Sequence, residues 1–257
     1  MIRIAAVGDI HMGLDSQGLF RPAFDTLPHC ADLLLLAGDL TRHGTPREAE
    51  VVARELTGLA VPVVAVLGNH DHHDEKPEEV TAILQEAGVR VLEGEATVVD
   101  VDGVRVGVGG TKGFGGGFAG RCGSEFGEPL MKEFVRYTRR CADGLRSSLQ
   151  TLEREGCALR IALTHFSPVP DTLAGEPPEI YPFLGSYLLA EAIDTAGAEL
   201  AVHGHAHAGT EHGMTGAGVR VRNVAQPVIR RAFSVYHLSA AHPAAPAPTT
   251  ARPAEPH

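Results

Sequence analysis

The tetrapeptide Gly68-Asn69-His70-Asp71 combines side chains that can bind metals, hold phosphate oxygens and transfer protons. It ends an apolar, β-branched run at residues 61–67, which is typical of a buried strand. Asn and His can each ligate a metal or contact a phosphate oxygen, and an Asp can orient a neighbouring imidazole. Because Asn and Asp also favour turns for backbone reasons, the tetrapeptide alone is equally compatible with a plain polar turn.

Similar polar clusters follow other apolar runs of the chain. Asp9 and His11 come after the run at residues 2–7, and their i, i+2 spacing places both side chains on one side of an extended segment. This pair alone is explained more simply as an Asp helix cap followed by a chance histidine. His205 and His207 repeat the spacing, however, and further strand ends carry Asp or His. The candidate site residues are Asp9, His11, Asp39, Asn69, His70, Asp71, His165, His205 and His207.

The residue types in this set favour a transition-metal centre. Mixed imidazole and carboxylate ligands suit Mn, Fe, Zn or Ni, whereas Ca and Mg prefer all-oxygen ligands. The set without His70 and Asp71 holds seven candidate ligands, more than one tetrahedral ion uses. We therefore expect two divalent or trivalent ions (Mn, Fe or Zn, with Mn favoured) that share one carboxylate. Two metals about 3.5–4 Å apart can clamp a phosphate and hold a bridging hydroxide for in-line attack.

The elements that must position these residues alternate between strands and helices in the first part of the chain. Strands are predicted at residues 2–7, 33–37 and 61–67, with helices at 45–56 and 77–88. Thr45, Pro46 and Glu48 form a helix start with a capping box. Crossover helices imply a parallel sheet whose loops gather at one edge, where open α/β sheets place their sites.

The rest of the chain predicts a second, antiparallel-rich sheet. Short strands are expected at residues 90–92, 96–101 and 104–108, the last two joined by a hairpin at Asp102-Gly103, and further strands at 159–163, 200–202, 219–224 and 232–238. Helices are expected at residues 129–155 and 186–196. We interpret the longer helix as scaffold, with an apolar stripe of Phe134, Tyr137, Leu145, Leu149 and Leu152.

Several features have two interpretations or no assigned role. The glycine-rich segment at residues 109–127 is either a mobile loop that offers Lys112 or Arg121 to a substrate or a plain flexible connection. His203 precedes His205 by two residues, so both side chains would point to the same side of an extended segment. Because His203 lies inside a strand, we expect it in the core or behind the metal ligands. His72 and His73 are expected to be exposed loop histidines.

Composition sets the broad class of the protein. The chain has 257 residues, 44% of them hydrophobic and 21% charged, as in ordinary globular proteins. The net charge of −10 argues against strong binding to nucleic acid or anionic membranes, although a local metal cluster can still attract a phosphate. The N-terminus lacks the layout of a signal peptide, no apolar run approaches the ~20 residues of a membrane span, and the four cysteines have no Cys-x-x-Cys spacing. We expect a reduced cytoplasmic protein with a single domain at residues 1–240 and a disordered Ala/Pro-rich tail at 241–257.

At the level of motifs, the chain resembles the calcineurin-like metallophosphoesterases. The resemblance rests on Asp9-x-His11, Gly38-Asp39, Gly68-Asn69-His70-Asp71, His165 and Gly204-His205-Ala206-His207, which occur in the family's order. It implies a four-layer α/β/β/α sandwich with two mixed β-sheets flanked by helices, and a dinuclear site where strands of both sheets end.

The resemblance also implies a role for each residue. Asp9, His11 and His207 would hold one metal; Asn69, His165 and His205 would hold the other; and Asp39 would bridge them. His70 would be the general acid or a phosphate contact, oriented by Asp71. A histidine can donate a proton to a leaving alkoxide near neutral pH, which agrees with that role.

The chain departs from one branch of the family. The second motif of the phosphoprotein phosphatases ends in Arg-Gly, whereas His43 precedes Gly44 here, which argues against a protein phosphatase and leaves the phosphate-binding arginine unassigned. We expect an enzyme that hydrolyses a small phosphomonoester or phosphodiester. A catalytically silent metal-binding scaffold of the same fold is the main alternative, and a single-metal hydrolase of another bond, such as an amide, is a third.

Overall fold

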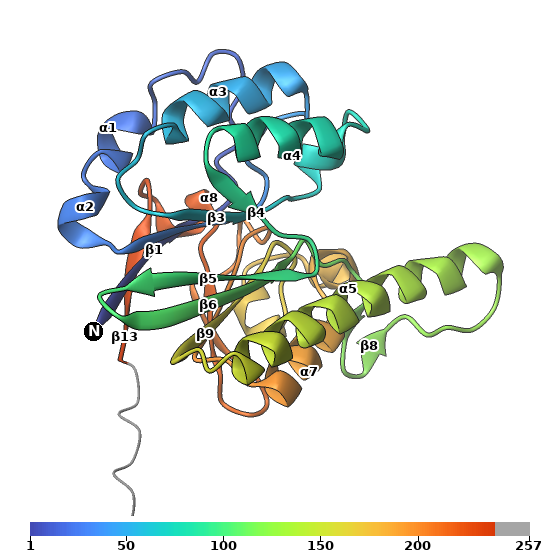
Figure 1. Ribbon diagram of the computed structural model, residues 1–257. Coiled ribbons are helices and arrows are strands. Elements are labelled where there is room, and N and C mark those ends of the chain that lie inside the picture. Colours follow the sequence, from blue (N-terminus) through green and yellow to red (C-terminus); the bar gives the residue numbers. More distant parts are fainter. Residues whose placement is uncertain (240–257) are drawn as a thin grey trace, which may run out of the picture.

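A computed structural model describes residues 1–239 of the chain as two mixed β-sheets packed face to face with helices on both outer faces (Figure 1). This is the expected four-layer α/β/β/α architecture. Residue 240 and the predicted Ala/Pro-rich tail at residues 241–257 lie outside the described residues.

The first sheet has the strand order β13-β1-β2-β3-β4. Neighbouring strands from β1 to β4 are parallel, and β13 is antiparallel to β1. Parallel pairing follows from the helical crossovers between these strands and brings their carboxyl ends to one edge. The strands are β1 (Ile2–Val7), β2 (Leu33–Ala37), β3 (Val63–Val66), β4 (Val89–Val91) and β13 (Ser234–Leu238).

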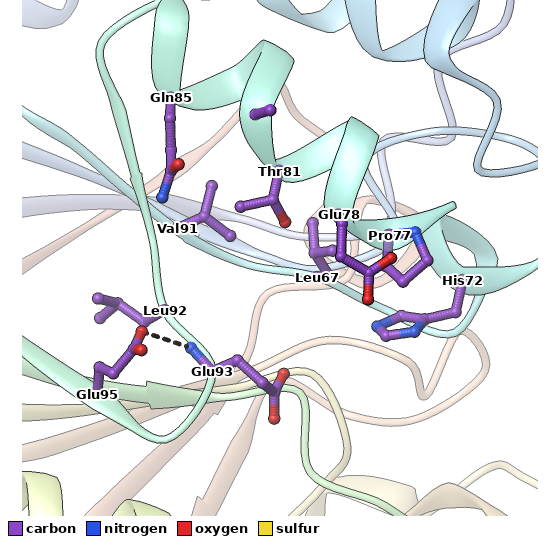
Figure 2. Close-up of a pocket in the computed structure, with 11 residues that line it drawn as sticks. Leu67, His72, Pro77, Glu78, Thr81, Gln85, Val91, Leu92, Glu93 and Glu95 are labelled. Carbon is purple, nitrogen blue, oxygen red and sulfur yellow. Dashed lines mark hydrogen bonds between the residues drawn. The ribbon is translucent and has the colours of Figure 1, made fainter. Parts of the chain in front are cut away.

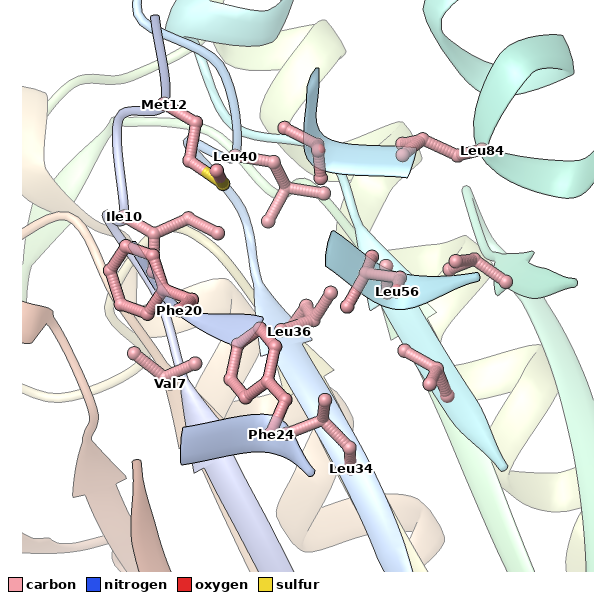
Figure 3. Packing of buried hydrophobic residues seen from close by; sticks show 14 of the residues in the cluster. Val7, Ile10, Met12, Phe20, Phe24, Leu34, Leu36, Leu40, Leu56 and Leu84 are labelled. Atoms are coloured by element: carbon pink, nitrogen blue, oxygen red, sulfur yellow. The ribbon is translucent and has the colours of Figure 1, made fainter. Parts of the chain in front are cut away.

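The helices on the outer face of this sheet bury a large apolar cluster against it (Figure 3). Phe20 and Phe24 stack on one another beside Val7 and Leu34, and Met12 packs near Leu40. The predicted capping box is present, since Thr45 accepts from the Glu48 backbone and Glu48 in turn accepts from that of Thr45. The helices are α1 (Arg21–Phe24), α2 (Leu27–Cys30), α3 (Pro46–Leu56), α4 (Pro77–Glu86) and α8 (Gln226–Ile229).

The second sheet has the order β11-β12-β10-β9-β6-β5. Its central strands β12, β10, β9 and β6 are parallel, while β11 and β5 pair antiparallel at the two edges. The expectation of an antiparallel-rich second sheet is therefore wrong, because three of its five strand pairings are parallel. The strand expected at residues 90–92 is β4 of the first sheet, and the last two predicted strands divide, with β12 in the second sheet and β13 in the first. The strands are β5 (Glu95–Val101), β6 (Val104–Thr111), β9 (Leu159–Thr164), β10 (Leu200–His203), β11 (His212–Met214) and β12 (Arg220–Asn223).

The outer face of the second sheet is covered by α5 (Pro129–Arg154) and α7 (Tyr187–Ala196), which lie side by side in Figure 1 and share an apolar cluster with the sheet. Short elements connect the strands at the site edge. They are η1 (His70–His72), β7 (Gly117–Phe118), β8 (Arg121–Cys122), η2 (Pro170–Leu173), η3 (Pro178–Ile180) and α6 (Tyr181–Leu184).

The continuous apolar runs arise because the central strands are buried on both faces. In β2, Leu34 and Leu36 face the helices, whereas Leu33 and Leu35 face the second sheet. Side chains of a strand alternate between faces, so a strand between two apolar layers needs an apolar residue at every position. Three apolar layers thus hold the four layers of the fold together.

The glycine-rich segment at residues 109–127, expected to be a mobile loop or a flexible connection, is partly a strand and is held by backbone hydrogen bonds. Its first residues extend β6 as far as Thr111, and Gly116 and Gly117 donate backbone hydrogen bonds to the carbonyls of Pro182 and Gly185. Lys112 is buried, with its ammonium 4.9–5.3 Å from three aromatic ring centres. It is therefore enclosed in the protein and not extended toward a substrate, whereas Arg121 is exposed in β8.

All four cysteines carry free thiols. Within residues 1–239, none of the helices has both the length and the apolar character needed to traverse a lipid bilayer.

Candidate metal centre

The candidate site residues lie where parallel strands of both sheets end. Asp9, Asp39 and Asn69 follow β1, β2 and β3 of the first sheet. His165 follows β9 of the second sheet, and the segment after β10 supplies His205 and His207. The two edges are joined, since Gly8 donates to the Val224 carbonyl across the sheets. Residues almost 200 positions apart are brought together in this way, as in the 2.9 Å contact between Asp9 and His207.

Three overlapping groups of possible ligand atoms occur at this edge, each with its atoms within 4.8 Å of one another. His11 and Asp39 each belong to two of them, and Asp39 supplies the only carboxylate that two of these groups share. The groups are Asp9, His11 and His207; His11, Asp39 and His70; and Asp39, His165 and His205.

On one side of Asp39, the imidazoles converge on Asp9. His207 Nε2 is 2.9 Å from Asp9 Oδ1 and 3.4 Å from His11 Nε2. His11 Nε2 is also 3.8 Å from Asp39 Oδ2. Ring nitrogens that face each other beside carboxylates are arranged as ligands of a shared cation would be.

On the other side, His165 is the central residue. Its Nδ1 is 2.8 Å from the Ala37 carbonyl, so Nδ1–H donates there and the Nε2 lone pair faces the site. That Nε2 is 2.9 Å from Asn69 Oδ1 and 3.4 Å from Asp39 Oδ1. His205 Nε2 is 3.2 Å from the Phe183 carbonyl, which leaves its Nδ1 free as a ligand atom.

Electrostatics in the centre favour bound positive charge. Burial acts to raise the pKa of Asp39, but the neighbouring His165 outweighs it and holds that pKa well below its usual range. Burial likewise acts to lower the pKa of His165, yet the nearby Asp39 carboxylate raises it to about 9. Buried carboxylates that draw a proton onto an imidazole would draw a metal cation to the same place. The donor set thus fits transition-metal ions.

Backbone strain is concentrated in the same residues. Non-glycine residues in the left-handed region are uncommon and cost about 1–3 kcal/mol each, so they persist where the surrounding structure enforces them. Hydrogen bonds from the Asp9 and His11 amides to the Gly38 and Asp39 carbonyls lock the two loops together. The candidate ligands with positive φ are Asp9 (56°), His11 (41°), Asp39 (50°) and His205 (69°).

The glycines of the motifs make room for the ligands of neighbouring motifs. A Cβ on Gly68 would collide with Asp39 Oδ1, and one on Gly204 would collide with Asp9 Oδ2. Each glycine therefore allows a carboxylate from another strand end to approach the backbone closely. This explains why a glycine precedes Asn69 and His205 in their motifs.

His70 lies at the solvent side of the centre. Its Nδ1 is 2.8 Å from the Arg42 carbonyl, and its Nε2 faces inward, 3.9 Å from Asp39 Oδ2. The ring packs edge-on against His11, with 4.5 Å between ring centres. With Nδ1–H donated to the backbone, Nε2 is the atom available to a substrate or a metal.

The expected contact between Asp71 and His70 is replaced by other bonds. Asp71 is fully buried and accepts from the Thr41 hydroxyl at 2.6 Å, while the His70 ring is held by Arg42. Its remaining partners are the backbone amides of Leu40, Thr41 and Gly68. Asp71 thus ties the loop after β2 to the loop after β3 and positions the backbone of the site. The sequence could not show this, because any nearby amide can satisfy a carboxylate.

The remaining histidines near the motifs, His203, His72 and His73, differ in their burial. His203 is fully buried, 2.8 Å from the Thr172 hydroxyl and 2.7 Å from the Gly204 carbonyl, in the core as expected. The expectation that His72 is exposed is wrong. It is half-buried and lines a cavity of about 390 Å³, where Figure 2 shows it near Glu78 and opposite Glu95. His73 is exposed, as expected.

The structure also contains an apolar pocket beside the centre that was not predicted from the sequence. It has a volume of about 400 Å³, and we call it the phenylalanine pocket. Phe114 and Phe134 come from the glycine-rich segment and from the helix interpreted above as scaffold, and Phe166 directly follows His165. The signal that could have indicated the pocket is the group of four Phe residues at positions 114, 118, 126 and 134. The lining residues are Asn69, Phe114, Gly115, Phe134, Phe166, Ile180, Phe183, Leu184 and His205.

Comparisons with solved structures agree with the fold. The phosphopantetheinyl hydrolase PptH from Mycobacterium tuberculosis matches with a TM-score of 0.65 and 16% identity, over 88% of this chain and 90% of that one. A 5'-nucleotidase precursor from Thermus thermophilus matches with a TM-score of 0.52 and 17% identity, over 86% of this chain and 48% of that one. At such identities these matches show a shared fold.

Sequence comparisons are more specific. A probable cyclic nucleotide phosphodiesterase of Synechococcus sp. is 34% identical over 93 residues, which make up 32% of this chain and 34% of that protein. The alignment thus spans about a third of the relative's length. The calcineurin-like phosphoesterase family model matches residues 2–209, a range that contains every candidate site residue. With this match and the fold described above, the chain belongs to the calcineurin-like phosphoesterase family.

Proposed function

We propose that this protein hydrolyses small phosphate esters at a centre of two transition-metal ions. The observation that carries the proposal is the position of Asp39, whose carboxylate is shared by two groups of possible ligands, one on each side. When bound, two such ions supply Lewis acidity toward the phosphoryl oxygens and toward water.

The proposed ligands divide around Asp39. Asp9, His11 and His207 would hold one ion, and Asn69, His165 and His205 the other. The mixture of nitrogen and oxygen donors supports Mn, Fe or Zn, and Mn is our first choice. The hydrogen bonds from His165 to the Ala37 carbonyl and from His205 to the Phe183 carbonyl support this division, since they orient one ring nitrogen of each toward Asp39.

His70 is the proposed proton donor. The Arg42 carbonyl fixes its ring so that Nε2 faces the centre, and its solvent exposure lets it regain a proton from water after each turnover. A donor at this place would neutralise the alkoxide that leaves the phosphate.

The substrate class is a small phosphate ester. The net charge of −10 supports a small molecule over a nucleic acid. The name of the Synechococcus relative makes cyclic nucleotides the first phosphodiesters to test.

The experiment removes and restores the metal. Protein stripped by a chelator and reloaded with Mn is assayed with an aryl phosphomonoester and a bis-aryl phosphodiester, and Mn content is measured by elemental analysis. Asp39→Asn should lower both turnover and Mn content, turnover by about 100-fold or more, since even residues behind the ligands change such sites by about 10–100-fold.

Asp32→Asn is the matched control. Asp32 lies just before the amino end of β2, whereas Asp39 follows the carboxyl end, and Asp32 pairs with Arg3 at 2.6 Å. The Asp32→Asn variant should therefore keep its metal and its turnover. Two bound metals without turnover of either ester or of a cyclic nucleotide would contradict the proposal and favour a silent scaffold. Full activity of Asp39→Asn would refute the shared carboxylate.

A further inference from the structure

The phenylalanine pocket is continuous with the proposed metal centre. Asn69 and His205 line both, and the ring of Phe166 lies 4.3 Å from that of His205 between centres. His205 is in turn 4.8 Å from His165. A group in this pocket is therefore next to a molecule held at the centre.

Aromatic rings form most of the pocket wall. Phe114 is 5.5 Å from Phe166 and 5.1 Å from Phe134 between ring centres, so the three rings form one surface contributed by three separate segments. Aromatic faces and edges of this kind bind another flat ring better than a flexible chain of equal area, because ring–ring contacts add to apolar burial. A volume of about 400 Å³ is in the range of small-molecule sites.

The pocket wall is also held in place. The Pro182 carbonyl accepts a hydrogen bond from Gly116, and the Phe183 carbonyl accepts one from His205 Nε2. Behind the wall, the Lys112 ammonium is buried against the rings of Phe114 and Phe166. A pocket held by these contacts requires little reorganisation to bind a ligand.

Charge and exposure identify the kind of group that fits. Among the described residues that line the pocket, the only polar side chains are Asn69 and His205, so a charged group would lose hydration without gaining a partner. At the rim, the side chain of Phe183 is 62% exposed and Ile180 is 37% exposed. Exposed large apolar side chains beside an apolar cavity are typical of a binding site.

We propose that the phenylalanine pocket binds an uncharged flat ring carried by the organic part of the ester substrate. This inference rests on the proposed function, because the phosphate must lie at the metal centre for the ring to reach the pocket. A simple aryl alcohol and a nucleobase both supply such a ring. Substrates whose organic part is small and polar, such as glycerol phosphate, leave the pocket unfilled.

Binding of phosphonates tests the proposal without the effect of leaving-group reactivity. Titration calorimetry of the Mn-loaded protein compares phenylphosphonate with methylphosphonate. Phenylphosphonate should bind about tenfold more tightly, as expected for stacking of one ring on aromatic side chains. Phe183→Ala should lower the logarithm of this affinity ratio by at least about a third, because one of several rings in the pocket wall is lost. Equal binding of the two phosphonates, or binding of neither, would overturn the proposal.

Phe126→Ala is the matched control. Phe126 is 81% exposed and lies outside the pocket lining, so the same substitution there should leave the preference unchanged. Equal losses in Phe126→Ala and Phe183→Ala would mean that general surface hydrophobicity, and not the pocket, produces the preference.

One further measurement distinguishes a nucleobase from a simple aryl group as the source of the ring. Another distinguishes failure of the proposed esterase function from failure of the pocket assignment. The affinity of a cyclic adenosine phosphorothioate is measured for the wild type and for Phe183→Ala. If Phe183→Ala lowers this affinity as it lowers that for phenylphosphonate, the ring in the pocket is a nucleobase. If the phosphorothioate binds the wild type no more tightly than methylphosphonate does, the ring is a simple aryl group. Ring preference without turnover of any ester would refute the esterase and keep the pocket assignment. Turnover without ring preference would refute the pocket assignment alone.

Discussion

His70 differs from the other residues of the centre in its exposure. Its side chain is 43% exposed, whereas Asp39 and His165 are buried. Its Nε2 is close enough to Asp39 and His11 to be a metal ligand, and it also faces the space where a leaving group would lie. Proton donation and metal binding predict different behaviour when this imidazole is removed.

We expect His70→Asn to slow esters with poor leaving groups far more than esters with good ones. An alkyl phosphate needs a proton on its leaving oxygen, so its turnover should fall by about 10²–10⁴, while that of a nitrophenyl phosphate should fall much less. Measured Mn content should stay at two ions per chain. Loss of one ion with an equal decrease for all esters would instead make His70 a ligand. His73→Asn, at an exposed position nearby, is the control.

At the scale of elements, the packing of β6 against α5 depends on glycines. A Cβ on Gly107 would lie 2.7–3.0 Å from atoms of the Leu152 side chain, and one on Gly109 would lie 2.5 Å from Ser148 Oγ. Leu152 and Ser148 are both buried in α5. The glycines of β6 therefore set the distance between helix and sheet, and β6 leads directly into the segment that carries Phe114.

Gly107→Ala should destabilise the protein by about 1–3 kcal/mol, because the added methyl overpacks a filled interface. The free energy of unfolding is measured by urea titration. Gly216→Ala, where the nearest neighbour of the new Cβ is at an ordinary 3.4 Å, should change it by less than about 0.5 kcal/mol. Combining Gly107→Ala with Leu152→Ala should cost less than the sum of the two single changes. Strict additivity would contradict the proposed contact.

At the scale of the whole molecule, the centre joins the two sheets. Asp9, Asp39 and Asn69 come from the first sheet, and His165, His205 and His207 follow strands of the second. The apolar layer between the sheets holds these edges together. A metal held by residues of both sheets binds the folded state only, so its binding free energy adds to the stability of the whole fold.

Mn should therefore raise the melting temperature of the protein. At a concentration of about 100 Kd, one site adds about 2.7 kcal/mol. For a domain of this size that corresponds to a rise of roughly 5–10 °C, measured by scanning calorimetry with and without a chelator. In Asp39→Asn the rise should largely disappear, whereas Asp32→Asn should retain it. An unchanged melting temperature in the wild type would show that the folded chain does not hold the metal.

By itself, the sequence did not predict the short helices α1, α2 and α8 or the edge strand β11. It did determine the longer strands and helices of the chain, the place of the candidate ligands at strand ends, and the resemblance to the family. These features are local: the apolar runs of β1, β2 and β3, the capping box of α3 and the spacing of Asp9 and His11 depend on residues near one another in the chain. Local periodicity and turn chemistry are sufficient to predict them.

The tertiary structure alone decided which partners the side chains have. Asp71 binds the amides of another loop, Lys112 is enclosed by rings, His72 lines a cavity, and the phenylalanine pocket combines residues from several distant segments. The physical reason is that a carboxylate, an ammonium group or a phenyl ring can satisfy its requirements with many partners. Only the packing of two sheets and their helices determines which of those partners is within reach.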